Sequence, residues 1–364
     1  MTVAIVGSGL AGFTAYQTLR LELEPEEIAV FGTEPDPAAA WRRRAAAIRQ
    51  REMRSESDGH CLPRSFPGLA FRATARRRSP VPLVASFLDR FHPTVDEFLA
   101  HVERLRERSG WERSVREARV DRVRATDGGF DLDGHGTFRH VLLAPGHPGL
   151  NVPEELRGDA RVVHSYEPHD YAATVTVVGA GLAAATEWLN ALAAGAEVVS
   201  VRRREPVRQQ LNVPRAYFSR RGLDAFHELG PAERTARLRT LLAPSYPRGR
   251  AWDEPVDRAA AEGRFRIEAS VNGSAQVICA TGFRRGFRAD PLLARLVDKH
   301  ALATADDWVV LDADATVPAL TDEMRTLGLA GVSAQWAFPA ADTLVGAKYV
   351  AHGFLRRIRS CRTR

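Results

Sequence analysis

Glycines with the spacing G-x-G-x-x-G, or its alanine-ended variant, occur at two places in this chain. The residues that show this spacing are Gly7, Gly9 and Gly12, and then Gly179, Gly181 and Ala184. In such a turn the first glycine permits a tight bend, the second lets the backbone approach a pyrophosphate, and the third lets a helix and a strand pack closely. The helix that follows contributes backbone amides and the positive end of its dipole. The chemistry that this pattern favours is the binding of a dinucleotide.

Both turns have the context that this chemistry needs. A β-branched run at residues 2–6 predicts a strand before the first turn, and a helix and a second strand are predicted after it. Residues 174–178, a helix and residues 197–201 repeat that order around the second turn, 172 residues further along. Strand, helix and strand in this order form a parallel sheet. A single glycine turn also fits a loop in an unrelated α/β protein, but two in this context predict two Rossmann-type units.

The residues after the second strand of each unit indicate which nucleotide binds. An acidic residue there accepts hydrogen bonds from ribose hydroxyls, whereas arginine accommodates a 2′-phosphate. The strand at 197–201 is followed by Arg202, Arg203 and Arg204. These arginines favour NADPH over NADH. The alternative is a solvated arginine run, since residues 42–44 and 76–78 are similar runs.

The first unit departs from this rule. The acid expected at the end of its second strand would fall on Gly32, and Glu34 is the only acidic residue close by. We therefore expect Glu34 to take the ribose-binding role.

The other segments predict helices and short strands. Residues 35–92 are rich in proline and arginine and only weakly periodic, whereas the apolar spacing from residue 95 to 105 predicts an amphipathic helix. Short alternating strands are predicted at 118–123, 129–132 and 137–143, and a helical stretch at 222–243.

Length and charge restrict the class of protein. The chain has 364 residues, more than a single hydrophobic core usually supports, so two lobes are expected. The formal net charge of +6 and the pI of about 9.6 would alone suggest a nucleic acid or an anionic membrane as partner. Only Lys299 and Lys348 are lysines, so the excess reflects a general arginine bias. We expect neither nucleic acid nor a membrane as a partner.

The three cysteines lie far apart and form no C-x-x-C pair, which argues against a dithiol redox centre, a zinc ribbon or a disulfide framework. No metal site is expected. The N-terminus lacks the features of a signal peptide, and no apolar run reaches the length of a spanning helix. A cytoplasmic protein is expected.

In these motifs the chain resembles the two-dinucleotide-binding-domain flavoproteins, and its layout is most similar to the class B flavin-dependent, N-hydroxylating monooxygenases. Ala280-Thr281-Gly282 matches the segment with which those proteins cross between domains, and Ala144-Pro145-Gly146 is a looser copy. The resemblance implies FAD at the first glycine turn and NADPH at the second. It also implies cofactor contacts at Glu34, Val120, Gly146, Thr281 and Gly282.

The resemblance implies an α/β fold with two Rossmann-like domains, the NADPH domain being inserted into the FAD domain, together with small β meanders. Residues 1–165 and 285–364 would form the FAD domain, and residues 166–284 the NADPH domain. The chain departs from the family at two places. A linker motif of the monooxygenases is degenerate around His164, for which a backbone hydrogen bond is the plainer interpretation, and Val332 stands where the family has an aspartate near the flavin.

The loop at residues 51–60 corresponds to the segment that covers the flavin in the monooxygenases. On that ground the catalytic candidates are Arg54, Ser55, Asp58 and His60. A polar surface loop is the alternative for each of them.

The function implied by the resemblance is that of an FAD- and NADPH-dependent monooxygenase. It would oxygenate an amine, sulfide or ketone with molecular oxygen through a flavin hydroperoxide. One alternative is an NADPH-dependent flavoprotein reductase that passes electrons to a quinone, a protein or a small molecule. A second is a non-catalytic protein that keeps a degenerate flavoprotein fold, which Gly32 and Val332 motivate. Residues 208–221 either line a substrate entrance or only connect elements.

Overall fold

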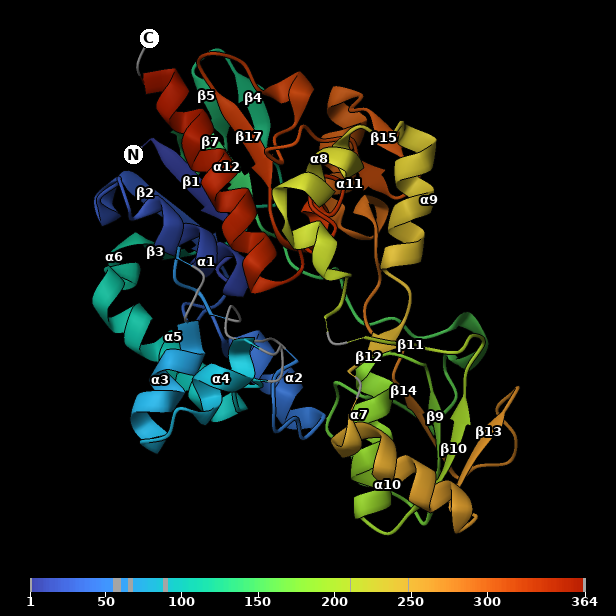
Figure 1. The fold of residues 1–364 in the computed structure, drawn as a ribbon. Coiled ribbons are helices and arrows are strands. Elements are labelled where there is room, and N and C mark those ends of the chain that lie inside the picture. The colour runs from blue at the N-terminus through green and yellow to red at the C-terminus, as the bar shows by residue number, and fades with distance from the viewer. Residues whose placement is uncertain are drawn as a thin grey trace.

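The computed structural model describes residues 2–54, 60–64, 68–87, 91–209, 211–247 and 249–362, which contain two separate five-stranded parallel sheets (Figure 1). The first sheet has the strand order β17-β7-β1-β2-β3. Its strands are β1 (Val3–Val6), β2 (Ile28–Gly32), β3 (Val115–Glu117), β7 (His140–Leu143) and β17 (Thr326–Leu329). The chain therefore returns to this sheet at its end, because β17 pairs with β7 in parallel register.

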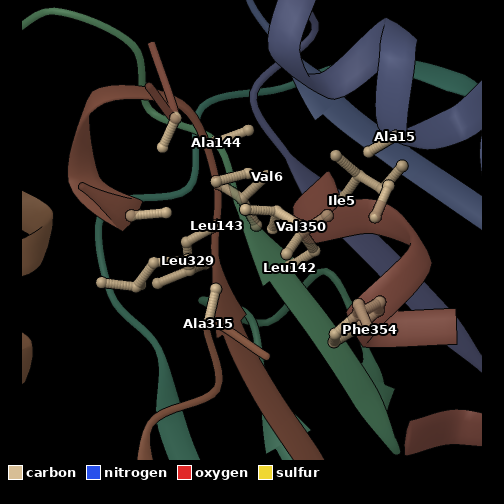
Figure 2. Packing of buried hydrophobic residues seen from close by; sticks show 14 of the residues in the cluster. Ile5, Val6, Ala15, Leu142, Leu143, Ala144, Ala315, Leu329, Val350 and Phe354 are labelled. Atoms are coloured by element: carbon tan, nitrogen blue, oxygen red, sulfur yellow. The ribbon is translucent and has the colours of Figure 1, made fainter. Parts of the chain in front are cut away.

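Helices α1 (Leu10–Leu19) and α12 (Leu344–Arg362) pack together against the first sheet. Val350 and Phe354 of α12 share one buried cluster with Ile5 and Leu142 of the strands (Figure 2). An ion pair between Arg359 and Glu22 joins the C-terminal end of α12 to the residues just after α1. The two helices therefore run in the same sense, and both begin near the carboxyl ends of the strands.

The second sheet has the strand order β13-β10-β9-β14-β8. Its strands are β8 (Val162–His164), β9 (Thr174–Val178), β10 (Glu197–Val201), β13 (Phe265–Glu268) and β14 (Gln276–Cys279). Helices α7 (Leu182–Ala193) and α10 (Arg250–Ala261) pack against each other in this lobe. The indole of Trp188 on α7 is buried edge-on against the rings of Phe265 and Tyr246.

The remaining elements surround these sheets. The helices are α2 (Ala39–Ala47), α3 (Gly68–Arg77), α4 (Val81–Phe87), α5 (Val95–Ser109), α6 (Trp111–Ser114), α8 (Arg220–His227), α9 (Pro231–Leu241) and α11 (Pro291–His300). The short strands are β4 (Arg124–Thr126), β5 (Gly129–Asp131), β6 (Thr137–Phe138), β11 (Val207–Arg208), β12 (Ser245–Tyr246), β15 (Thr304–Ala305) and β16 (Trp308–Val309). Among the described residues, no helix is long and apolar enough to cross a bilayer.

The predicted fold class is confirmed: the protein is α/β with two Rossmann-like units and an antiparallel meander of β4, β5 and β6. The boundaries at residues 165/166 and 284/285 stay a proposal. Strand β8 precedes the first boundary yet belongs to the second sheet. Val213 and Leu238, which lie inside the proposed second domain, pack in the core of the first.

The predicted helix from residue 95 is confirmed as α5. Its N-terminus has a reciprocal capping box, in which Thr94 Oγ1 accepts from the amide of Glu97 and the Glu97 carboxylate accepts from the amide of Thr94. Gly110, in the left-handed conformation, ends it.

Three sequence predictions were wrong in detail. Residues 137–143 form two strands in different sheets, β6 in the meander and β7 in the first parallel sheet. Residues 118–123 form no strand: they link β3 to the meander, and the apolar residues Ala118 and Val120 on either side of exposed Arg119 imitate strand alternation. The stretch at 222–243 is two helices, because Pro231 starts α9 and holds Gly230 extended before it.

Candidate functional site

The first glycine turn is shaped by contact between three segments of the first sheet. Gly7 has φ +119°, and a Cβ atom on it would lie 2.0 Å from the carbonyl oxygen of Ala144, which follows β7. A Cβ on Gly12 would lie 1.9 Å from the carbonyl oxygen of Gly7. Glycine is therefore required at both positions for β1, α1 and β7 to pack as they do.

Gly9 has a different role. Its φ of −72° suits any residue, and a Cβ there would meet nothing within 4 Å. Gly9 is the N-cap of α1, no side chain caps the helix, and its first turn holds no acid. Backbone amides and the positive end of the helix dipole thus face an open space, an arrangement that suits a pyrophosphate.

The second glycine turn repeats this geometry. Gly179 has φ +141°, and a Cβ on it would lie 2.4 Å from the carbonyl oxygen of Ala280. Gly181 is the uncapped N-cap of α7, and a Cβ on it would meet nothing within 4 Å. Ala184 is fully buried, as the third position of the motif requires.

The two crossing segments share one structural role. Ala144 and Ala280 each begin a crossing segment, and each places its carbonyl oxygen against the first glycine of the turn in its own sheet. The last residues of the two segments, Gly146 and Gly282, both have positive φ, +77° and +72°. The looser copy at residues 144–146 is therefore the structural counterpart of Ala280-Thr281-Gly282.

Between the sheets, the chain continues from the crossing segments, and there residues 149–151 and 282–284 run antiparallel and are hydrogen-bonded. The amide of Asn151 donates to the carbonyl of Gly282 at 2.9 Å, and the Thr281 hydroxyl donates to the carbonyl of Asn151. The imidazole Nε2 of His164 lies 3.0 Å from the carbonyl oxygen of Gly282. His164 therefore makes a hydrogen bond to the backbone, which is the simpler of the two roles considered for it from the sequence.

Aromatic rings stack beside this crossing. Phe283 lies between His147 and Tyr166, at centroid distances of 4.1 and 5.0 Å, and the guanidinium of Arg44 lies 4.6 Å from its centroid. Burial lowers the pKa of His147 to about 4, and the positive charges of Arg44 and Arg285 act in the same direction. His147 is therefore neutral at neutral pH.

The end of β2 explains the departure at Gly32. A Cβ on Gly32 would lie 2.0 Å from Ser8 Oγ, whose hydroxyl donates to the carbonyl of Glu34 at 2.6 Å. Ser8 therefore occupies the space that an acidic side chain at residue 32 would need. Glu34 lies beyond this contact, and its half-exposed carboxylate pairs with Arg43 at 2.8 Å.

The end of β10 holds the arginines predicted to read a 2′-phosphate. The side chain of Arg202 is only 11% exposed and pairs with Glu205 at 2.9 Å. Its guanidinium carbon lies 6.0 Å from the centroid of Trp188, and its Nε is buried without a hydrogen-bond partner among the described residues. Arg203 and Arg204 are exposed. Arg202 is therefore the fixed member of the three.

A cavity of about 240 Å³ opens beyond the carboxyl ends of β7 and β17. Gly146 and Pro148 line it from the segment after β7, and Val332 and Ser333 from the segment after β17. The other lining residues, from α9, the start of α11 and the hairpin of β15 and β16, include Arg239, Arg285, Phe287, Asp290, Asp307 and Trp308. The cavity combines apolar walls with a few charged groups, as ligand sites do.

Comparison with known proteins gives a likeness of structure only, since no family model and no curated protein sequence matches this chain. The ornithine hydroxylase of Pseudomonas aeruginosa has 18% identity and a TM-score of 0.69, over 98% of this chain and 99% of that one. The cadaverine monooxygenase of Erwinia amylovora has 14% identity and a TM-score of 0.72, over 98% and 94%. The bacillithiol disulfide reductase of Bacillus cereus has 15% identity and a TM-score of 0.59, over 100% and 99%.

The chain shares the fold of these solved structures over nearly its whole length. The fold predicted from the motifs is thereby confirmed. Within this fold the two glycine turns, Gly146, Thr281, Gly282 and the three arginines lie at the carboxyl edges of their sheets, where ligands of open α/β sheets bind.

Of the four catalytic candidates, Arg54 and His60 are among the described residues. Ser55 and Asp58 lie outside the described residues. The guanidinium of Arg54 donates to the carbonyls of Gln209 and Leu211 at 2.8 and 2.7 Å and to Ser245, and burial lowers its pKa to about 10. Arg54 thus ties the first lobe to the segment around β11 and β12. His60 is buried with its ring 5.9 Å from that of His101.

Val120 and Val332 are the remaining predicted positions. Val120 is 7% exposed in the core of the first lobe, just after β3. Val332 follows Gly331, whose φ is +67° and whose position next to Ala11 brings this segment to the start of α1. Gly331 and Val332 therefore lie beside the start of α1, with valine at the position where the family resemblance led us to look for an aspartate.

Sequence reasoning missed a polar pair from distant segments. The Asn212 amide donates to the Asp342 carboxylate at 3.0 Å. The surrounding protein raises the pKa of Asp342, an effect that Arg285 and Arg54 oppose. The pair joins residues 208–221 to the start of α12. No spacing within the sequence could have indicated this contact, because it depends on how the two lobes meet.

Proposed function

We propose that this protein is an FAD-dependent, NADPH-consuming oxidoreductase, and that it acts as a monooxygenase on a small nucleophile such as an amine. The observation that carries the proposal is the repeated glycine turn, in which an uncapped helix N-terminus faces open space in both sheets. The solved structures named for ornithine hydroxylase and cadaverine monooxygenase, which share the fold over nearly the whole chain, support the choice of reaction.

The residues present fit FAD at the first turn. The amides at the start of α1 would bind the pyrophosphate, and Glu34 is the nearest acid for the adenosine ribose. Glu34 is already paired with Arg43 through one carboxylate oxygen. To bind the ribose as well, the Glu34 carboxylate would have to accept hydrogen bonds from the ribose hydroxyls without breaking that ion pair.

The residues at the second turn fit NADPH. The start of α7 would bind the pyrophosphate, and Arg202 with Arg203 and Arg204 would bind the 2′-phosphate. Arg202 is already held by Glu205 and the face of Trp188, so little side-chain freedom is lost on binding.

The chemistry supplied by bound FAD would be acceptance of hydride from NADPH and activation of molecular oxygen, with one oxygen atom going to the substrate and the other to water. The protein's part is to orient the reactants and exclude water. The cavity beyond β7 and β17 is the site proposed for the reacting groups, and the neutral, half-buried His147 stands in the sequence between two of its lining residues, Gly146 and Pro148. The stack of Tyr166, Phe283 and His147 holds the crossing segments that form the cavity's wall.

The test begins with the purified protein and added FAD. A yellow protein that oxidises NADPH faster than NADH, and that converts an amine from a panel to its hydroxylamine in proportion to NADPH used, is the expected result. NADPH oxidation that yields only hydrogen peroxide with every amine, sulfide and ketone, but is stimulated by a quinone or disulfide, would support the reductase instead. The bacillithiol disulfide reductase shares the fold with a lower TM-score, and this chain has no C-x-x-C pair. A colourless protein that binds neither cofactor would exclude both enzymes.

A further inference from the structure

Helices α3 and α4 carry exposed apolar and arginine side chains that the proposed function does not explain. Residues 68–87 contain four arginines and no acidic residue. Three large apolar side chains in the same stretch are exposed: Phe71 by 58%, Val81 by 66% and Val84 by 55%. The two helices lie together beside α5 (Figure 1).

The exposed residues of this helix pair are those that do not pack on the first lobe. Leu69, Ala70 and Ala73 of α3 are buried against that lobe. We call the exposed arginines and large apolar residues of the pair the α3–α4 surface: Phe71, Arg72, Arg76, Arg77, Arg78, Val81 and Val84. Exposed apolar side chains interspersed with arginines are typical of helices that lie on an anionic lipid surface.

A hollow of about 70 Å³ between α3 and α5 adds a site for an anion. Arg72, Arg76 and Arg104 line it, and the only acid that lines it is Glu97. Glu97 is shared between Arg76 at 2.9 Å and Arg77 at 3.2 Å. Arg104 Nε is buried without a hydrogen-bond partner among the described residues.

The positive charges around the hollow are not balanced. Burial and the nearby Arg104 and Arg108 lower the pKa of Arg72. The other acids of α5 are Asp96, Glu103 and Glu107, of which Glu103 pairs with Arg106. The hollow therefore has room and charge for one phosphate group.

We propose that the α3–α4 surface binds an anionic phospholipid membrane, with a lipid phosphate in the hollow of Arg72, Arg76 and Arg104 and with Phe71, Val81 and Val84 inserted among the headgroups. Apolar side chains and cations then act together, each arginine near the surface adding electrostatic attraction. A free phosphate, or the carboxylate of an acidic protein, would occupy the hollow but leave the apolar side chains unused. The sequence led us to expect no membrane partner because the positive charge reflects a general arginine bias and no apolar run spans a bilayer, but peripheral binding needs neither an excess of lysine nor a spanning segment.

The test is co-sedimentation of the full-length protein with vesicles of phosphatidylcholine, alone or with about a third of phosphatidylglycerol. Binding is expected only to the anionic vesicles, and it should weaken as salt is raised. Arg72→Gln with Arg104→Gln should lower partitioning roughly thirty-fold, since each arginine near the surface contributes about 1 kcal/mol. Phe71→Ser with Val84→Ser should lower it by about ten-fold or more, by removing apolar area from the interface.

Two matched variants control for charge and for apolar exposure. Arg220→Gln with Arg221→Gln removes the same charge from exposed residues of α8, and Met324→Ser with Ile267→Ser removes apolar side chains that are equally exposed elsewhere. Both should bind vesicles as the unchanged protein does. The proposal is overturned by binding to neutral vesicles alone, by an equal loss in the control variants, or by no binding to any vesicle. Saturable binding of inorganic phosphate or of polyglutamate that requires Arg72 and Arg104, without vesicle binding, would overturn it in favour of a soluble anion or an acidic protein.

Discussion

At the scale of single residues, the glycines of each turn divide into two kinds. Gly7 is required by the fold, because a Cβ would collide with the Ala144 carbonyl and its φ is +119°. Gly9 has no such constraint from the protein itself. The two kinds of glycine are therefore separable by experiment.

We predict that Gly9→Ala leaves the thermal unfolding midpoint of the FAD-free protein nearly unchanged while weakening FAD binding roughly ten-fold or more, a loss of about 1.4 kcal/mol. The new methyl group would occupy the space through which a pyrophosphate approaches α1. Gly7→Ala should instead lower the unfolding midpoint of the FAD-free protein. Equal FAD affinity in Gly9→Ala and the unchanged protein, measured by fluorescence titration, would contradict the assignment.

Arg202 is predicted to be the main reader of the 2′-phosphate. Arg202→Gln should raise the KM for NADPH by about ten- to a hundred-fold, the range for a lost charge-assisted hydrogen bond, and leave the KM for NADH within two-fold. Arg258→Gln, an exposed arginine of α10 in the same lobe, is the control and should change neither value. Equal effects on both coenzymes would show that Arg202 supports the fold and does not select the coenzyme.

The residue types at the turns were predictable because the motif is local: spacing, strand and helix lie within about twenty residues of one another. Three contacts of the site were not predictable: Ser8 with Gly32, Arg43 with Glu34, and Asn212 with Asp342. The contacts of Ser8 and Asn212 depend on tertiary packing. The partner of Glu34 is one of many arginines in the chain, and no short sequence pattern identifies which of them forms the ion pair.

At the scale of elements, α5 buries a histidine that should make stability depend on pH. Burial, with His60, Arg72, Arg104 and Lys348 nearby, lowers the pKa of His101 from 6.5 to about 3. Between those values the unfolded chain binds the proton and the folded chain does not. The contribution to stability is therefore complete above pH 6.5 and is lost as the pH falls towards 3.

His101→Leu should flatten that dependence. Between pH 7.5 and pH 5 the unchanged protein should lose about 2 kcal/mol of unfolding free energy through this residue, at about 1.4 kcal/mol per pH unit below 6.5. The variant should lose correspondingly less, as measured by urea denaturation at both pH values. His135→Leu, at an exposed position, is the control. An identical pH dependence in His101→Leu and the unchanged protein would refute the prediction.

Elements with long, regular periodicity were predicted correctly, as α5 shows. Of the short strands, the one predicted at 129–132 is confirmed as β5, but the one predicted at 118–123 was wrong, because Ala118 and Val120 in a connecting segment give the same alternation as a strand. The change of sheet at Arg139, between β6 and β7, also leaves no trace in an apolar run. The spacing of apolar residues indicates which side chains are buried, but it does not indicate which strand a segment pairs with through backbone hydrogen bonds.

At the scale of the whole molecule, side chains of one lobe are fixed to the other. Ile48, at the end of α2, belongs to the core of the second lobe, and the Asn190 amide donates to its carbonyl at 2.8 Å. Arg54 makes the corresponding link to Gln209, Leu211 and Ser245. The relative position of the two glycine turns therefore depends in part on these contacts.

Arg54→Met is predicted to impair electron transfer between the lobes and not cofactor binding. The carbonyls of Gln209 and Leu211 would lose a buried donor, which costs about 1 to 3 kcal/mol of unfolding free energy. The rate of flavin reduction by NADPH should fall, while FAD affinity and reduction by dithionite stay unchanged. Arg51→Met, an exposed neighbour, should have no effect. A normal reduction rate by NADPH with loss only of product formation would instead support the catalytic role predicted for Arg54.

The pairing of β17 with β7 has a consequence for biosynthesis. When the ribosome has completed β7, the strand that will cover its edge is still 183 residues away, from Leu143 to Thr326. At about 5 to 20 residues per second, that edge stays uncovered for roughly ten to forty seconds. The second sheet, whose strands all lie between residues 162 and 279, can be completed within this interval. A nascent chain of this protein therefore has to keep an apolar strand edge from pairing with its neighbours on the same messenger RNA, and a delay in the second half of translation would lengthen that exposure.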